Sequence, residues 1–216
     1  MVDRRSPAAA LVPLTGVLFV VFTVVGLLLG GEAPDADAPV DEVVEYWVDN
    51  EGAMFAGSIL EVFGAISLVF FAASLRRTLG RRERTGILSL AAMGGGIVAS
   101  AGIGVDAAIR FAAADIADAD TLDPAVLQTF NAFWANFFFP MVVGLFALIL
   151  ATSLSALTTR VLPVWLGWVG IVLCIALATP AGFIAFIVSA LWILIVSVML
   201  WRHEAASSGE PLSAIP

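Results

Sequence analysis

Long runs of apolar residues are the feature of this sequence that most constrains its fold. The first run, AAALVPLTGVLFVVFTVVGLLLG, covers residues 8–30, and several comparable runs follow it. A helix needs about 20 such residues to cross a hydrocarbon core of roughly 30 Å, where only helices and closed barrels satisfy their backbone hydrogen bonds. Because 61% of the residues are hydrophobic and only 13% are charged, we expect an all-α, polytopic integral membrane helix bundle.

Six transmembrane helices are predicted, in one transmembrane domain that covers residues 1–216. The first run follows two arginines, as a secretory signal does, but it is longer than a signal core of about 7–15 residues and is expected to be retained. The last apolar stretch is too long for one crossing, and its ATPAG segment at 178–182 predicts the turn of a helical hairpin. The predicted spans are about 8–30, 52–75, 87–112, 126–157, 163–178 and 183–202.

The segments next to the spans carry weaker signals. Apolar residues recur at helical spacing over 40–49, which predicts a short amphipathic helix lying on the outer membrane surface, or else capping a cavity. Asp123 and Pro124 fit the N-cap and first position of the fourth helix. Tryptophans near the ends of the spans are expected to anchor the protein at the membrane interfaces; they are Trp47, Trp165, Trp168 and Trp201.

The arginines predict the orientation. All ten basic residues are arginine, and all except Arg110 fall at the two termini or in the second and fourth loops. Positively charged loops stay in the cytoplasm, so we expect a multi-pass protein of the cell membrane with both termini cytoplasmic. The first and third loops carry most of the acidic residues. They could attract cations, although plain solvation of the loops explains them as well.

Several chemistries are excluded by residues that the chain lacks. Cys174 is the only cysteine and His203 the only histidine, so an intramolecular disulfide, a multi-histidine zinc site and a Ser/His dyad are not expected. Because the chain has no lysine, it cannot form a Schiff base with retinal. Outside the short arginine-rich loop it has no basic patch, so nucleic-acid binding is not expected. We expect no metal, cofactor or nucleic acid and favour a non-enzymatic protein, with carboxylate catalysis left open.

Three ionisable residues lie inside predicted spans. Asp106 and Arg110 are four residues apart in GIGVDAAIRF, a spacing that favours an intrahelical ion pair, and Arg110 could also snorkel to the outer surface. Gly95, Ala99, Gly102 and Asp106 share one stripe of the helix, so the pair is expected to face the bundle. Glu61 falls at a comparable depth in the second span. Two acids then face one base, and the unpaired carboxyl is expected to hold a proton.

The fourth span can add amides to this cluster. Asn131 and Asn136 lie at a similar level, but they are about 140° apart on an ideal helix, so only a distortion lets both reach one spot. Pro140 can cause it, because it removes the hydrogen bond to the carbonyl of Asn136. The surrounding FNAFWANFFFP, residues 130–140, could stack on a ligand, but packing against helices or lipid explains these aromatic residues better.

The cluster supports three functional hypotheses. The first is a small ligand, lipid or partner protein bound at the outward-facing polar residues Glu61, Asp106, Arg110, Asn131 and Asn136. The second is a small proton- or cation-coupled transporter, which needs an aqueous path to the cytoplasmic face. The third is a structural cluster that only fixes helix packing. Beyond the lipid bilayer and a small-molecule or proton ligand, a second copy of the chain is a candidate partner through the glycine stripe.

The C-terminal part carries a resemblance. LPVWLGWVGIVLC, PAGFIAF and LWILIVSVMLWR, over residues 160–202, resemble the DUF4386-like family of bacterial integral membrane proteins. The resemblance implies a polytopic membrane protein of uncharacterised function, and it transfers no catalytic residue.

Overall fold

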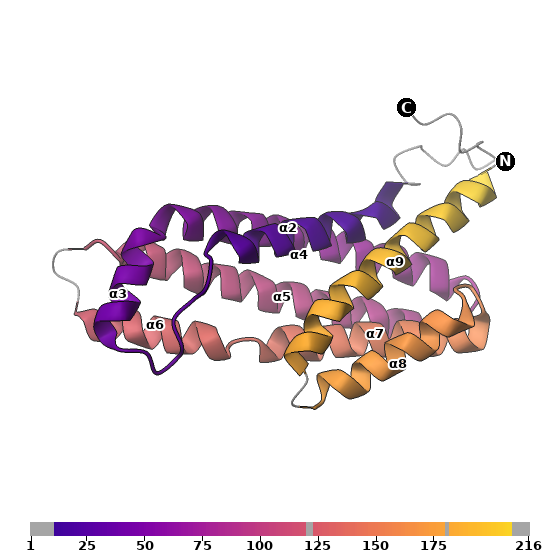
Figure 1. Ribbon diagram of the computed structural model, residues 1–216. Coiled ribbons are helices and arrows are strands. Elements are labelled where there is room, and N and C mark those ends of the chain that lie inside the picture. Colours follow the sequence, from indigo (N-terminus) through magenta and orange to yellow (C-terminus); the bar gives the residue numbers. More distant parts are fainter. Residues whose placement is uncertain (1–10, 120–122, 180–181, 209–216) are drawn as a thin grey trace.

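The protein is an elongated bundle of helices (Figure 1). The computed structural model describes residues 11–119, 123–179 and 182–208, which form helices and connecting turns without a strand. The elements are η1 (Val12–Leu14), α2 (Thr15–Leu29), α3 (Val40–Asp49), α4 (Glu51–Gly80), α5 (Ile87–Ile116), α6 (Pro124–Asn136), α7 (Phe139–Thr159), α8 (Val164–Leu177) and α9 (Gly182–Ser208).

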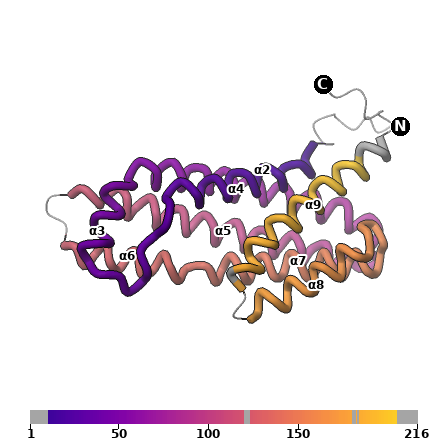
Figure 2. The backbone as a smooth tube through the Cα atoms, viewed as in Figure 1, coloured from indigo at the N-terminus to yellow at the C-terminus, as the bar shows by residue number. Residues whose placement is uncertain are grey.

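Five helical segments are long and apolar enough to cross a membrane, which suits a membrane-embedded protein. They are 12–29, α4, α5, the α6–α7 pair and 184–204. The segment expected as the fifth span, α8, is apolar but has only 14 residues, about 21 Å of helix. The α8–α9 hairpin therefore ends partway along the bundle, beside α7 (Figure 2).

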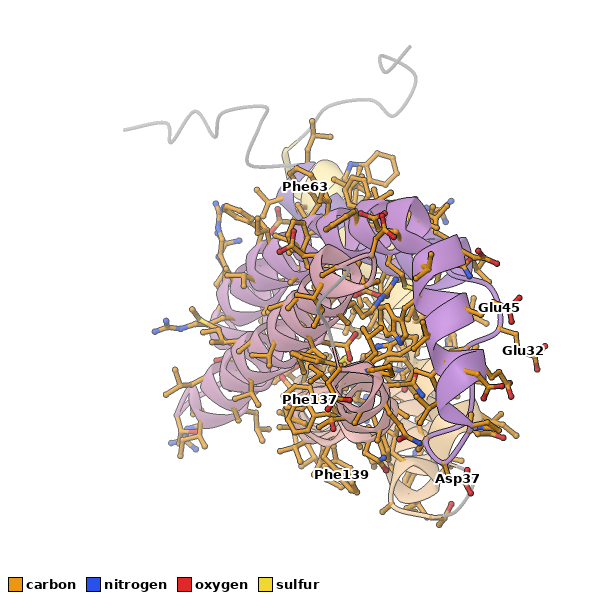
Figure 3. The ribbon with its side chains drawn as sticks, turned by 90° about the vertical axis from the view of Figure 1, so that its left-hand side faces the viewer. Glu32, Asp37, Glu45, Phe63, Phe137 and Phe139 are labelled. Atoms are coloured by element: carbon orange, nitrogen blue, oxygen red, sulfur yellow. The ribbon has the colours of Figure 1, made fainter. Side chains whose placement is uncertain are left out.

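The two ends of the bundle differ in charge. At one end, here called the terminal end, α2 begins, α9 ends, and the α4–α5 and α7–α8 connections turn (Figure 1). These connections expose Arg81, Arg82, Arg84 and Arg160. At the opposite end, the α3 end, exposed acidic side chains such as Glu32, Asp37 and Glu45 point away from the bundle (Figure 3).

The amphipathic segment 40–49 is the helix α3, but its apolar face does not lie against lipid. Val43 and Trp47 are completely buried, in a cluster with Met54 and Leu127. The ring of Trp47 packs edge-to-face on Trp134 of α6, with ring centroids 5.6 Å apart. The expectation that Trp47 is an interface anchor is wrong, because α6 covers the face that the sequence pattern left open. Trp165 and Trp168 are exposed.

The fourth predicted span is divided into two helices. Asp123 caps α6, accepting a hydrogen bond from the amide of Ala125 at 3.0 Å, with Pro124 in the first turn. The helix ends at Asn136, and α7 begins at Phe139 with Pro140 in its first turn. Proline lacks the amide that would continue the ladder to Asn136, which explains why the interruption falls here.

Candidate functional site

Glu61 and Arg110 form a buried ion pair between α4 and α5. The guanidinium Nη1 lies 2.5 Å from the Glu61 Oε1, and both side chains are at most 2% exposed. Arg110 therefore turns into the bundle and does not snorkel to the surface. In the described residues this ion pair joins two helices. Arg110 pairs with Glu61, 49 positions earlier in the chain, and not with Asp106 of its own helix as the sequence spacing predicts.

The remaining contacts of Arg110 fix its position. Nη2 donates to the carbonyl of Gly26 in α2 at 3.3 Å, and the guanidinium lies over the ring of Trp134, 5.4 Å from its centroid. A cation over an indole face is favourable, most of all where water is excluded. Space for the guanidinium depends on Gly57, because a Cβ there would lie 2.5 Å from Nη2. Arg110 thus joins α2, α4, α5 and α6.

Asp106 lies one helical turn from Arg110 on the same face of α5 and is 5% exposed. Asp106 and Trp134 of α6 line the same cavity, which is described below. Trp134 thus shares a cavity wall with Asp106, and its ring faces the guanidinium of Arg110. It belongs to the aromatic segment 130–140, which sequence reasoning assigned to packing.

The two asparagines are not brought together. Asn131 is completely buried, and its Nδ2 donates to the carbonyls of Pro34 and Asp35 at 3.3 and 3.1 Å. It fixes the α2–α3 connection. Asn136 is exposed and donates to the carbonyl of Ala132 in its own helix at 2.7 Å. Neither lines the cavity described next.

A cavity of about 730 Å³ lies beside the ion pair. It is located where α6 gives way to α7 and where the α8–α9 hairpin ends. Glu61, Asp106, Thr23 and Thr179 are its polar lining side chains besides the indole of Trp134. Most of the other walls are apolar or aromatic and include Leu27, Ile103, Phe138, Phe139, Met141, Leu177 and Phe186. Ligand sites in proteins have this character, a largely apolar concavity with a few polar groups.

Two of the polar groups at the cavity lack a hydrogen-bond partner among the described residues. They are the Oε2 of Glu61 and the Oγ1 of Thr23, both buried. An unsatisfied buried polar atom costs about 1–3 kcal/mol, so a native structure is expected to satisfy such atoms. The hydroxyl of Thr23 was not foreseen, because a single threonine in an apolar span is not distinguishable by pattern.

Toward the terminal end the bundle is packed mainly with apolar side chains, with buried hydroxyls such as those of Ser100, Thr152 and Ser153 among them. Leu68, Leu145, Leu148 and Ile149 are 0–2% exposed and belong to one core cluster. Beyond them the hydroxyl of Thr78 donates to Glu204 at 3.0 Å, about 25 Å along α4 from Glu61. The cavity is thus separated from the polar groups of the terminal end by a packed layer.

The comparisons with known proteins show no relationship: no protein-family model, curated protein or solved structure matches the chain. The resemblance of residues 160–202 to the DUF4386-like family therefore stays a prediction.

Proposed function

We propose that this integral membrane protein binds a small molecule in the cavity beside Glu61, Asp106 and Arg110. The supporting observation is the cavity itself, which combines apolar walls with the unsatisfied atoms of Glu61 and Thr23. We further propose that the arginine-rich terminal end faces the cytoplasm of the cell, because positive charge favours that side.

A proton- or cation-coupled transporter is the second candidate. The observation in its favour is the buried Glu61 carboxylate, one oxygen of which has no hydrogen-bond partner in the described part of the chain, since intramembrane acids often serve in proton relays. The layer of Leu68, Leu148 and Ile149 offers such a relay no ionisable side chain, although the buried hydroxyls of Thr152 and Ser153 lie one turn beyond it on α7. This layer supports binding over transport.

Quenching of tryptophan fluorescence by 6-bromohexanol is expected to test the binding site. Trp134 lines the cavity, so bromine bound there should quench it saturably in lipid nanodiscs. Trp134→Phe should remove the saturable part and leave the quenching of exposed Trp165 and Trp168 by alcohol in the lipid.

A variant that fills the cavity provides the control. Ala178 lines the cavity, whereas Val172 of α8 is 63% exposed and lies outside its lining. Ala178→Phe should weaken the saturable quenching at least tenfold, and Val172→Phe should leave it unchanged. Equal quenching in Ala178→Phe and the wild type, or none that depends on Trp134, contradicts the proposed site.

A further inference from the structure

The acceptor groups at the cavity outnumber the donors. Glu61 Oε2 and Thr23 Oγ1 accept no hydrogen bond from the described residues, and both side chains are more than nine-tenths buried. Asp106 contributes a carboxylate to the same wall. Hydroxyl oxygens both donate and accept, but carboxylate oxygens only accept when ionised. A molecule that satisfies this wall must therefore bring several donors.

The formal charges at the site also favour a positively charged ligand. Two carboxylates, Glu61 and Asp106, face the single guanidinium of Arg110, which is joined to Glu61 and to the Gly26 carbonyl and whose Nε has no hydrogen-bond partner among the described residues. The uncharged donors among the lining residues are the indole of Trp134 and the hydroxyls of Thr23 and Thr179. With both acids ionised, the site carries one excess negative charge. A charge is costly in a membrane unless it is paired, so one additional positive charge completes the site.

The remaining walls fit a hydrocarbon group. Leu27, Ile103, Leu177 and Phe186 come from four different helices and surround the cavity beside the acids. Burying an alkyl chain against them contributes about 0.8 kcal/mol per CH₂. In addition, the exposed acidic residues Glu32, Asp37 and Glu45 at the α3 end (Figure 3) raise the local concentration of cations.

We propose that the cavity takes an amphipathic primary ammonium ion, with its –NH₃⁺ between Glu61, Asp106 and Thr23 and its hydrocarbon part against the apolar walls. The three N–H donors of a primary ammonium match the three acceptor groups. This inference rests on the proposed function, since it names the class of ligand for the same cavity.

Displacement of 6-bromohexanol from the wild-type protein in phosphatidylcholine nanodiscs tests the proposal. Three competitors of equal chain length are compared: hexylammonium, hexyltrimethylammonium and 1-hexanol. Hexylammonium should displace the probe at a concentration at least tenfold lower than 1-hexanol does. Hexyltrimethylammonium carries the charge but no N–H donor, so it should displace the probe less well than hexylammonium does.

Thr23→Val is the decisive variant. The two side chains have nearly the same shape, and the hydroxyl that is lost has no partner in the described residues, so folding should be preserved. The advantage of hexylammonium over 1-hexanol should fall several-fold, while displacement by 1-hexanol stays the same. Asp106→Asn should reduce that advantage further.

The outcomes separate this inference from the proposed function. If 1-hexanol and hexylammonium displace the probe equally, or if hexyltrimethylammonium equals hexylammonium, the cavity binds ligands but the ammonium assignment is wrong. An unchanged preference in both Thr23→Val and Asp106→Asn also overturns the assignment. If 6-bromohexanol gives no quenching that depends on Trp134, the proposed function fails and the inference fails with it.

Discussion

Replacing Arg110 by methionine is expected to lower the free energy of unfolding by about 3–5 kcal/mol, because it leaves the Glu61 carboxylate buried without its partner. The variant also removes the hydrogen bond to the Gly26 carbonyl and the contact with the Trp134 ring. These contacts join four helices, so the loss should appear in the cooperative unfolding of the whole bundle. The measurement is the midpoint and free energy of unfolding by sodium dodecyl sulfate in mixed micelles.

The double variant Glu61→Gln/Arg110→Met distinguishes the contribution of the whole ion pair from the cost of leaving one buried charge unpaired. It removes both charges of the pair, so Glu61 no longer leaves a buried charge without its partner, and we expect it to be more stable than Arg110→Met. Arg77→Met is the matched control, since Arg77 is exposed on α4 and such changes usually stay within about 0.5 kcal/mol. If Arg110→Met unfolds like Arg77→Met, the ion pair does not hold the helices together.

The same double variant bears on function. A cluster needed only for packing would lose nothing further once the pair is replaced without loss of stability. A binding site would keep its fold, and its preference for hexylammonium would be reduced, because the Glu61 carboxylate is lost as an acceptor while Asp106 keeps its charge. Stability and ligand preference measured on one protein therefore distinguish the structural hypothesis from the binding hypothesis.

The helical fold and the buried position of the acids could be predicted because the signals are local. Apolar runs identify membrane helices through length alone, and the stripe of Gly95, Ala99, Gly102 and Asp106 identifies the buried face of α5, where the structure buries all four. A charge among apolar residues also stands out in the sequence. These properties depend on neighbours within a few turns of one helix.

The partners of these residues could not be predicted in the same way. The sequence spacing predicts a pair between Arg110 and Asp106. In the structure, the carboxylate of Glu61 on α4, which lies 49 positions earlier in the chain, is 2.5 Å from the guanidinium of Arg110. The apolar face of α3 is visible in the sequence, but whether lipid or α6 covers it is decided by tertiary packing, which buries Trp47. The cavity depends on where α6 ends and how far α8 reaches, and neither follows from periodicity.

The short length of α8 helps to form the cavity. At 14 residues it is shorter than a full crossing, and its end places Leu177 and Ala178 at the cavity. The break between α6 and α7 exposes Phe138 and Phe139 at the same level. Two interrupted helices thus meet where the buried acids lie.

Replacing Gly95 by alanine is expected to destabilise the bundle by about 1–3 kcal/mol, the cost of overpacking. A Cβ at this position would lie 2.7 Å from the carbonyl oxygen of Gly144 and against the backbone nitrogen of Leu148. Both are backbone atoms, so no side-chain rotation relieves the contact and α5 and α7 must separate. Close approach of membrane helices through small residues stabilises them by packing, and separation removes that contribution along the helix pair.

Gly94→Ala is the matched control because it makes the same chemical change one residue away. Gly94 is exposed, and a Cβ there meets nothing within 4 Å. Alanine favours a helix over glycine by about 1 kcal/mol, so this variant should be as stable as the wild type or slightly more stable. Unfolding in mixed micelles measures both. Equal stabilities of Gly94→Ala and Gly95→Ala would show that α5 and α7 do not touch through their backbones, and the wall formed by Ile103, Asp106 and Met141 would then be incorrectly placed, since α5 and α7 supply it.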